Sequence, residues 1–260
     1  MKTVAIIQGR MSSSRLPGKI LMDVEGVPLL AHVLRRAAAA QVFDAVIMAT
    51  STDRSDDPVE AFCRTEGFPC FRGDLQDVLK RYCFAARANG AEIITRLTAD
   101  CPLLDPAVVR QVVEAFDPSR HDYVSNSIER TYPDGLDTEV FSMAALERAY
   151  DEARLPSERE HVTSYLHKHP ELFRISQVTQ EEDLSALRWT VDEPKDLAFV
   201  RAVFAALGGG IFGQEQVLAL LKKHPELQRM NEGIGCNEGY QRSLREDDAS
   251  LRAPRSRTQP

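Results

Sequence analysis

The sequence lacks several features that define large classes of protein. It contains no apolar run approaching the roughly 18 residues that a membrane-spanning helix requires. Met1–Val4 leads directly into an expected strand and not into a basic, signal-like segment. No Cys-x-x-Cys pair occurs among the five cysteines, which are Cys63, Cys70, Cys83, Cys101 and Cys236. This odd, scattered set argues against disulfides or a zinc site, so we expect reduced thiols in a cytoplasmic protein with no membrane partner.

An excess of positive charge is also absent. The 260 residues include 32 Lys and Arg against 39 Asp and Glu, giving a formal net charge of −7. Such a chain is a poor candidate for non-specific nucleic-acid binding, which needs a basic surface. Apolar residues make up 43% and charged residues 27%, which excludes collagen, coiled coils and wholesale disorder. A globular protein remains, and it can bind phosphate wherever its cations gather.

Apolar strand-like runs alternate with helical patterns in the first half of the chain. We expect strands at Thr3–Gln8, Ala45–Ala49 and Glu92–Leu97, and helices at Leu29–Ala40, Asp56–Glu66, from an N-cap at Asp74 to Gly90, and from an N-cap at Asp105 to Phe116. This alternation predicts an α/β fold with three layers, in which helices cover both faces of a mostly parallel sheet. Ligands bind beyond the carboxyl ends of such strands, so the loops after Gln8, Ala49 and Leu97 should share one rim.

The second half is less regular. We expect strands at Asp122–Ser125, Leu136–Phe141, Phe173–Gln177 and Ala186–Val191, and helices at Ser142–Ala153, Ser157–His169, Pro194–Leu207 and Gln214–His224. Residues 208–213 match Gly-x-Gly-x-x-Gly but follow a helix, so we interpret them as a helix stop and linker. Residues 241–260 are charged, contain proline and have few large apolar side chains, which predicts a disordered tail.

A loop rich in cations and hydroxyls follows the first expected strand. Residues 9–19 contain Arg10, Arg15, Lys19 and three consecutive serines, with Gly9 and Gly18 permitting close backbone approach or positive φ. Backbone N–H groups and hydroxyls can cradle phosphate oxygens while the cations neutralise them. The loop is not a Walker A motif, because position 13 is Ser and Lys19 is followed by Ile. It indicates a phosphate site of another type, and the alternative is a solvated basic loop.

Two carboxylates follow expected strands near the same rim. Asp100 comes after the strand that ends at Leu97, and Asp192 after the strand that ends at Val191. Mg²⁺ typically takes one or two carboxylates together with phosphate and water. Asp100 caps no expected helix, whereas Asp192 could simply cap the helix that begins near Pro194. The pair is therefore a candidate magnesium site.

Several blocks carry a resemblance to a known family. Gln8–Lys19 closely resembles the opening signature of the cytidylyltransferases that activate sugar acids, in particular the branch of the spore coat polysaccharide biosynthesis protein SpsF. Further agreement, in order, is found at Arg72-Gly73-Asp74, Asp77–Tyr82, Arg96–Leu103, Asp134–Asp137, Arg159–Thr163 and Arg188–Asp192. The resemblance covers roughly residues 2–196, and at Gly9 the family usually has Ala.

The resemblance implies a Mg²⁺-dependent transfer of CMP from CTP to a sugar acid in surface polysaccharide or glycoconjugate synthesis. It implies catalytic roles for Arg10, Arg15, Lys19, Asp100 and Asp192, the last two holding the metal. The expected nucleotide-binding residues are Gln8, Gly9, Arg10, Met11, Ser12, Ser13, Ser14, Arg15, Lys19, Arg72, Thr98 and Ala99. The expected acceptor-binding residues are Asn126, Tyr132, Asp134, Asp137, Glu139, Glu160 and His161. Asp134-Gly135 could instead be an ordinary turn, and His161 a packing residue.

The resemblance also suggests an organisation for the chain. Residues 1–240 are expected to form one domain, with a nucleotide-binding part at about 1–120, an acceptor and dimerisation part at about 121–180, and a returning strand with helices at about 185–240. A homodimer is expected, with residues 136–169 as a candidate interface. Three other functions stay open: a cytidylyltransferase acting on a phosphonate or phosphorylated molecule, a nucleotide-sugar glycosyltransferase, and a non-catalytic nucleotide-binding module.

Overall fold

A central sheet organises the molecule. The structure is a computed structural model, and it describes residues 1–235 and 238–252. Over those residues the sheet has seven strands in the order β5-β4-β1-β6-β8-β7-β9, and β2 (Asp23–Val24) and β3 (Val27–Pro28) form a separate ribbon. The strands of the sheet are β1 (Thr3–Gln8), β4 (Ala45–Ser51), β5 (Cys70–Gly73), β6 (Ile93–Thr98), β7 (Tyr123–Ser125), β8 (Glu139–Ser142) and β9 (Ile175–Gln177).

The sheet is mostly parallel, which confirms the prediction. β1 pairs in parallel with β4 and β6, β4 with β5, and β7 with β9, whereas β8 runs antiparallel to β6 and β7. Gln8 is in register with Ala49 on one side and with Thr98 on the other. The carboxyl ends of three parallel strands therefore lie at one rim, where the loops that follow them begin.

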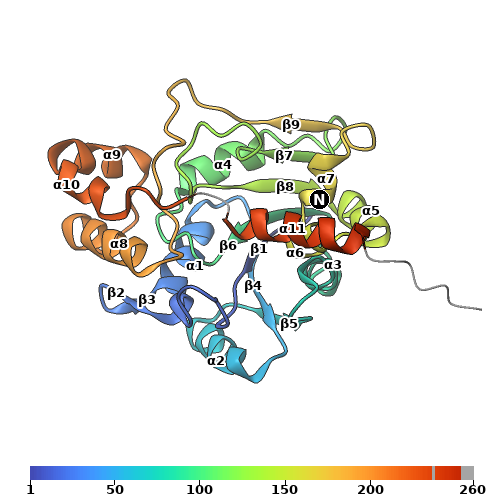
Figure 1. The fold of residues 1–260 in the computed structure, drawn as a ribbon, viewed down its shortest axis with the longest axis horizontal. Helices are drawn as coiled ribbons and strands as arrows, with labels where there is room; N and C mark the ends of the chain where they lie inside the picture. Colours follow the sequence, from blue (N-terminus) through green and yellow to red (C-terminus); the bar gives the residue numbers. More distant parts are fainter. Residues whose placement is uncertain (236–237, 253–260) are drawn as a thin grey trace, which may run out of the picture.

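Helices cover both faces of this sheet (Figure 1). They are α1 (Leu29–Ala39), α2 (Asp57–Glu66), α3 (Val78–Ala88), α4 (Pro106–Glu114), α5 (Met143–Glu152), α6 (Pro156–Glu160), α7 (Ser164–Lys168), α8 (Pro194–Leu207), α9 (Gln214–Lys223), α10 (Pro225–Gln228) and α11 (Glu238–Arg252), with short 3₁₀ turns at Lys19–Leu21, Arg54–Asp56 and Arg229–Asn231. None of the helices described is both long and apolar enough to cross a membrane.

The two faces of the sheet bury separate cores. On β1, Ala5 and Ile7 belong to the core that contains the buried side chains of α1, α4 and α8. Val4 and Ile6 belong to the opposite core, with α3 and α5. Because β1 is covered on both faces, it needs apolar side chains at every position, and this explains its continuous apolar sequence. The expected three-layer α/β fold is confirmed.

Three local predictions are wrong. Helix α3 begins at Val78, and its N-cap is Asp77, whose carboxylate accepts the Lys80 N–H at 2.9 Å; Asp74 instead closes the preceding turn. The helix expected at Ser157–His169 is two short helices, separated where Val162 adopts a positive φ of 42°. Residues 186–191 form no strand: they contribute an isolated bridge between Asp134 and Arg188.

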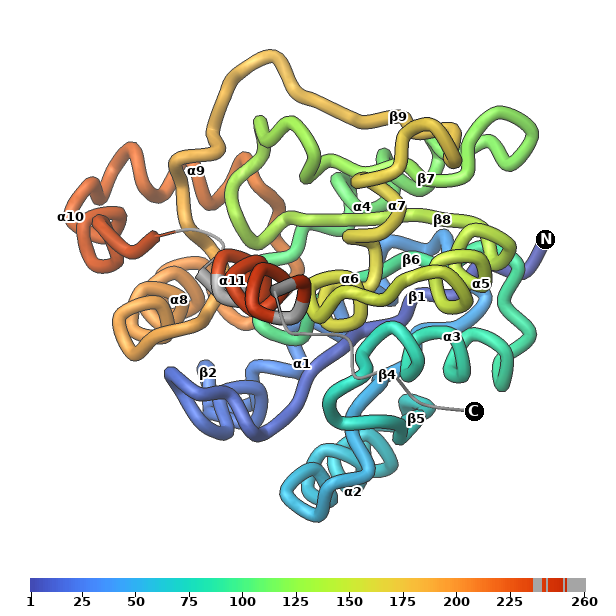
Figure 2. The backbone as a smooth tube through the Cα atoms, turned by 45° about the vertical axis from the view of Figure 1, so that its right-hand side comes forward, coloured from blue at the N-terminus to red at the C-terminus, as the bar shows by residue number. Residues whose placement is uncertain are grey.

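The expected disordered tail is also corrected over the residues that the structure describes. Helix α11 runs to Arg252, and residues 253–260 lie outside the described part. Figure 1 shows α11 crossing in front of the sheet, and Figure 2 shows it end-on between α8 and α6. It packs against α6. The linker prediction, by contrast, is confirmed, since α8 ends at Leu207 and Gly208 has a φ of 83°.

The described cysteines are free thiols, as expected. Cys63, Cys83 and Cys101 are buried, and Cys70 is partly exposed. Burial raises the pKa of the Cys101 thiol well above its ordinary value. Cys236 lies outside the described residues.

Candidate active site

The loop after β1 folds back on itself at the rim of the sheet. The Gly18 N–H donates to the Met11 carbonyl at 2.8 Å, and Gly18 has the positive φ of 76° that a side chain would disfavour. A Cβ on Gly9 would lie 2.5 Å from that of Ala99, so the backbone there passes close to the residue that follows β6. The buried carboxylate of Asp56 accepts the Met11 N–H at 2.7 Å and ties the loop to the start of α2.

Lys19 ends this loop and contacts both candidate metal ligands. Its Nζ lies 2.7 Å from Asp100 Oδ2 and 2.9 Å from Asp192 Oδ1, and it donates to the Val191 carbonyl at 2.8 Å. Burial would lower the pKa of Lys19, but Asp100 and Asp192 outweigh burial and raise that pKa. Two residues separated by more than ninety positions in the chain thus converge on one ammonium group.

Arg15 completes this charge cluster. Its guanidinium lies 3.0 Å from Asp192 Oδ1. Burial would raise the pKa of Asp192, but Lys19 and Arg15 lower it, so this carboxyl stays ionised. The structure therefore brings together Arg15, Lys19, Asp100 and Asp192 as the sequence predicts.

Asp192 reaches the cluster without the strand that was expected. The Val191 N–H donates to the Asp100 carbonyl at 2.8 Å, which places the two aspartates side by side. The N-cap of α8 is Glu193, not Asp192, and Asp196 in the first turn of the helix accepts the N–H groups of Asp192 and Glu193 at 2.9 and 3.0 Å. The capping alternative for Asp192 is thereby excluded.

The buried Arg188 guanidinium forms an ion pair with the Asp192 carboxylate. Its guanidinium is 2.9 Å from Asp192 and 3.0 Å from Asp196, and both its own side chain and Asp196 are almost fully buried. It also lies 3.2 Å from Asp134. The sequence analysis did not assign Arg188 a role; the i, i+4 and i, i+8 spacing to Asp192 and Asp196 was the available signal.

A cavity of about 630 Å³ opens over the loop. Its volume is in the range of small-molecule sites. It is lined by Gln8, Gly9, Arg10, Ser13, Ser14, Arg15, Lys19, Ile20, Thr98, Ala99, Asp100, Glu160, Asp192, Gln241 and Arg245. Most of the residues predicted to bind nucleotide share this cavity, which we call the loop cavity.

A second cavity of about 440 Å³ adjoins it. The two share Gln8, Arg15, Thr98, Asp100 and Asp192, so the acidic pair lies where they meet. The residues predicted to bind acceptor that line this second cavity are Asp134, Asp137, Glu139 and His161. Glu160 lines the loop cavity instead. We call the second space the acceptor cavity.

Charged pairs form one wall of the acceptor cavity. Arg96 is paired with Glu139, whose carboxylate also accepts the Tyr123 hydroxyl at 2.6 Å. Burial would raise the pKa of Glu139, but Arg96 and the hydroxyl donors lower it. The Arg130 guanidinium donates two hydrogen bonds, of 3.0 and 2.7 Å, to the Asp137 carboxylate. These pairs hold oxygen acceptors in fixed positions around a polar space.

His161 lines the acceptor cavity and contacts α11. Its Nε2 is 3.0 Å from the Ser243 hydroxyl, and its ring meets that of Tyr240 edge-on at 5.1 Å. Burial, and then the nearby Arg96, lowers the pKa of His161 to about 4, so the ring is neutral near pH 7.

Some predicted site residues lie elsewhere. Met11, Ser12 and Arg72 line neither cavity, and Arg72 on β5 is paired with Asp57 of α2 at 2.7 Å. The buried Asn126 side chain bonds the Leu136 carbonyl and the Thr138 N–H, and the Tyr132 hydroxyl donates to Gln111. These side chains stabilise loops, and in the described structure they do not border the space where a substrate would bind.

The donor set suits a hard divalent cation. Asp100 and Asp192 each place an oxygen beside the same Lys19 nitrogen, at 2.7 and 2.9 Å, so the two carboxylates lie close together. Within residues 1–235 and 238–252 no group of three or more His, Cys, Asp or Glu side chains could enclose a metal. Two carboxylates leave coordination positions for phosphate and water, as Mg²⁺ in nucleotide enzymes requires.

The fold and the site together define the class of protein. A cation-rich loop after β1 and the pair Asp100 and Asp192 at the junction of two cavities are the arrangement of a nucleotidyltransferase of the nucleotide-diphospho-sugar transferase fold. A family model described as cytidylyltransferase matches residues 4–223. SpsF, the spore coat polysaccharide biosynthesis protein of Bacillus subtilis, is 32% identical over 231 residues, covering 85% of this chain and 94% of its own. The 3-deoxy-manno-octulosonate cytidylyltransferase of Geobacter sulfurreducens is 36% identical over 114 residues, 44% of each chain.

A solved structure agrees with these matches. The cytidylyltransferase from Leptospira borgpetersenii superposes with a TM-score of 0.86 at 32% identity, covering 90% of this chain and 99% of that one. The chain thus belongs to the cytidylyltransferase family. It is accordingly a CTP-dependent nucleotidyltransferase, which confirms the predicted family and enzyme class.

Proposed function

We propose that this protein transfers CMP from CTP to a sugar acid, with release of pyrophosphate. An acceptor hydroxyl oxygen attacks the α-phosphorus, the bond from that phosphorus to the bridging oxygen breaks, and the hydroxyl proton passes to solvent. The observation that carries the proposal is the junction of the two cavities at Asp100 and Asp192. A triphosphate in the loop cavity would present its α-phosphorus there to an acceptor in the adjoining cavity.

The loop cations have a defined task in this reaction. Arg10, Arg15 and Lys19 line the cavity that would hold the triphosphate. They stabilise the charge that develops on departing pyrophosphate, which is mainly an electrostatic and positioning contribution. Lys19 is fixed by three contacts and therefore needs little reorganisation as the charge develops.

Asp100 and Asp192 would hold Mg²⁺. When bound, the ion would neutralise phosphate charge and make the phosphorus a better electrophile. The protein's own part is to hold the two carboxylates close together and to keep that of Asp192 ionised. Arg188 and Lys19 do this for Asp192, at 2.9 Å each.

The relatives and the polar walls of the acceptor cavity support the proposed acceptor class. SpsF is named for spore coat polysaccharide synthesis, and the Geobacter relative for activation of 3-deoxy-manno-octulosonate. The carboxylates of Asp134, Asp137 and Glu139 line the acceptor cavity and can accept hydrogen bonds from the hydroxyl groups of a substrate. Arginines beside them can pair with the carboxylate of an acid. A polyhydroxylated acid is the acceptor that uses both features.

A pyrophosphate-release screen tests the proposal. CTP with Mg²⁺ is incubated with nonulosonic and octulosonic acids, with phosphonates and phosphorylated small molecules as a second panel, and with each other nucleoside triphosphate. We expect release only with CTP and a sugar acid. Release with a phosphonate alone would overturn the acceptor class, and absence of release together with absence of CTP binding would overturn the function.

We also propose that the active form is a homodimer, as the resemblance implies. Tyr150 lies in the expected interface segment, residues 136–169. The ring of Phe84, a side chain that is 40% exposed, packs edge-on against it with 5.9 Å between the ring centroids. Light scattering should give twice the 29.1 kDa of one chain. The mass of a single chain would contradict this.

A further inference from the structure

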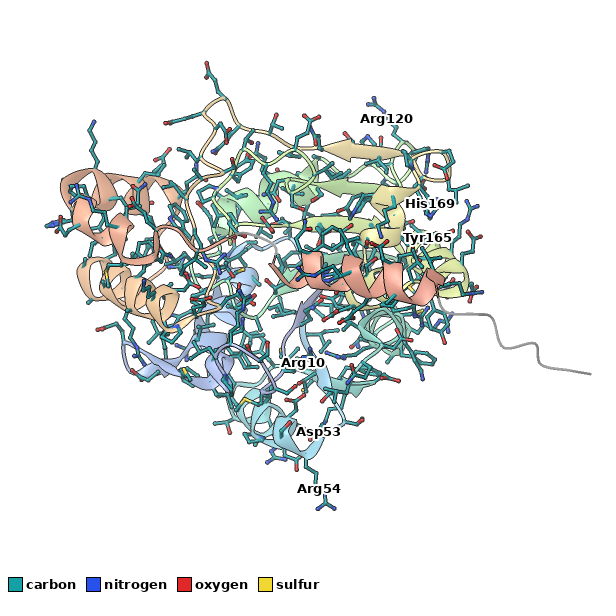
Figure 3. The ribbon with its side chains drawn as sticks, in the orientation of Figure 1. Arg10, Asp53, Arg54, Arg120, Tyr165 and His169 are labelled. Carbon is teal, nitrogen blue, oxygen red and sulfur yellow. The ribbon has the colours of Figure 1, made fainter. Side chains whose placement is uncertain are left out.

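Helix α11 lies beyond the part of the chain that defines the family. The family model ends at residue 223, and α11 begins at Glu238. The helix nevertheless borders the active site, because Gln241 and Arg245 line the loop cavity and Tyr240 lines the acceptor cavity. In Figure 3, Arg10 of the loop after β1 is labelled just below this helix.

Polar contacts on one side of α11 fix its position. Asp247 is 5% exposed, and its carboxylate accepts the Ser157 N–H at 2.8 Å and the Ser157 hydroxyl at 2.6 Å. Lys168 adds an ion pair to Asp247 at 3.6 Å. Ser243, fully buried one turn earlier, contacts His161. Residues 240, 243 and 247 follow helical spacing, so these contacts form one anchored stripe.

A second stripe of α11, formed by Gln241 and Arg245, faces the loop after β1. Gln241 and Arg245 are four residues apart and therefore lie on the same side of the helix. The anchored stripe reaches the loop as well: the Ser243 hydroxyl donates to Glu160 at 2.6 Å, and Glu160 lies 4.0 Å from Arg10. The position of α11 is thus linked through Glu160 to the loop.

Charge distinguishes Arg245 from the other cations of the loop cavity. Lys19 and Arg15 are paired with Asp192, and Arg10 faces Glu160. Within the described residues, Arg245 forms no ion pair with a carboxylate. A bound triphosphate carries several negative charges, and the loop cations are already partly neutralised. Arg245 is therefore the cation lining the loop cavity whose charge can pair with the triphosphate without first leaving a carboxylate.

We propose that Arg245 is a further nucleotide-binding residue, and that α11 covers the loop cavity so that this guanidinium binds the polyphosphate of CTP. The inference rests on the proposed function, since it takes a nucleoside triphosphate as the occupant of the loop cavity. The family-defining region supplies one wall of the phosphate site, and the C-terminal helix supplies the opposite one.

Calorimetric titration of the full chain with CTP and with CMP tests this. Arg245→Gln should weaken CTP binding by about tenfold, because one charge-assisted contact is lost, and should leave CMP binding unchanged. Arg245→Lys should restore part of the loss. Arg120→Gln is the matched control, because Arg120 is exposed and lies at the far edge of the molecule in Figure 3. It should bind both nucleotides as the wild type does.

The outcomes separate the two proposals. If wild type binds CTP and Arg245→Gln binds it equally well, the role of Arg245 is wrong and the function stands. If CTP and CMP weaken equally, Arg245 shapes the cavity and does not bind polyphosphate, which also overturns the inference. If wild type binds no CTP, the proposed function itself fails. Circular dichroism of each variant shows whether a loss reflects unfolding.

Discussion

At the scale of single residues, the site depends on two carboxylates that share one lysine. Asp100 and Asp192 would repel each other if Lys19 and Arg15 did not lie 2.7 to 3.0 Å from them. In the proposed reaction these carboxylates would exchange some of these contacts for a metal ion. On that proposal, their charge serves the reaction more than the fold.

Removing one of these charges should affect rate and leave the fold intact. We expect Asp100→Asn to lower kcat by about a hundredfold or more, equivalent to roughly 3 kcal/mol of barrier, because an isosteric amide cannot hold a divalent cation as a carboxylate does. Asp183→Asn, on an exposed loop, is the matched control and should keep its rate. Pyrophosphate release measures both, and a wild-type rate for Asp100→Asn would contradict the metal assignment.

The sequence could indicate which residues gather at the site where those residues are neighbours in the chain. Residues 8–19 form a continuous loop, so its cations could be assigned before their surroundings were known. Asn126, Tyr132 and Arg72 lie outside the two cavities for a physical reason: a polar side chain can be satisfied by backbone or by neighbouring side chains, and the sequence does not show which. Arg188 was missed although Asp192 and Asp196 lie only four and eight residues further along the chain, because that spacing alone does not show that the three side chains meet beside Asp134.

At the scale of elements, the turn at Gly135 fixes the acceptor wall. Gly135 has a φ of 117°, and a Cβ there would lie 2.8 Å from the backbone N of Thr190 and from the carbonyl carbon of Trp189. The Trp189 N–H donates to the Asp134 carbonyl at 2.6 Å, so the two segments cannot separate easily.

Gly135→Ala should therefore be strongly destabilising. Backbone strain and overpacking together predict a loss of about 2 kcal/mol or more in the free energy of unfolding. Gly90→Ala is the control: Gly90 also has a positive φ, of 59°, but a Cβ there would meet nothing within 4 Å. Urea denaturation compares them, and equal losses would show that the close approach to Trp189 has no energetic consequence.

The burial of His161 beside Arg96 predicts a pH dependence of stability. The pKa of His161 is about 4 in the folded protein and near 6.5 when unfolded. A lowered pKa gives stability that is complete above the unfolded value and is lost as pH falls toward 4. Because the side chain is partly exposed, we expect about 1–2 kcal/mol.

Melting temperatures between pH 7 and pH 4.5 measure this contribution. Carboxylates titrate over the same range, so the informative quantity is the difference between wild type and His161→Gln. The wild type should lose several degrees more than His161→Gln on acidification, at roughly 2–4 °C for each kcal/mol. His224→Gln, at an exposed histidine, should follow the wild type. Parallel curves for wild type and His161→Gln would contradict the assignment.

Element boundaries could be predicted where periodicity was strong. Helices α8 and α9 begin at the residues expected, because a proline at the first position and a glycine-rich linker mark them. The continuous helix expected at Ser157–His169 failed because its apolar spacing persists across a break at Val162. The strand expected at residues 186–191 failed because its hydrogen bonds go to loops, to Asp134 and Asp100.

At the scale of the whole molecule, the alternating pattern of strands and helices was sufficient for the fold class and for the shared rim. It was not sufficient for α11. That helix is held by Ser243 and Asp247 through hydrogen bonds and not by a broad apolar stripe, so its composition resembles that of a disordered tail. Buried polar anchoring leaves no periodic apolar signal in a sequence.

The central claim is that the loop cations and the acidic pair form one CTP–metal site. Anomalous diffraction from crystals grown with CTP and Mn²⁺ in place of Mg²⁺ tests it most directly. The account predicts a manganese peak in contact with the carboxylates of Asp100 and Asp192, and a triphosphate lying against Arg15 and Lys19. A nucleotide bound away from residues 8–19, or manganese in contact with neither aspartate, would contradict it.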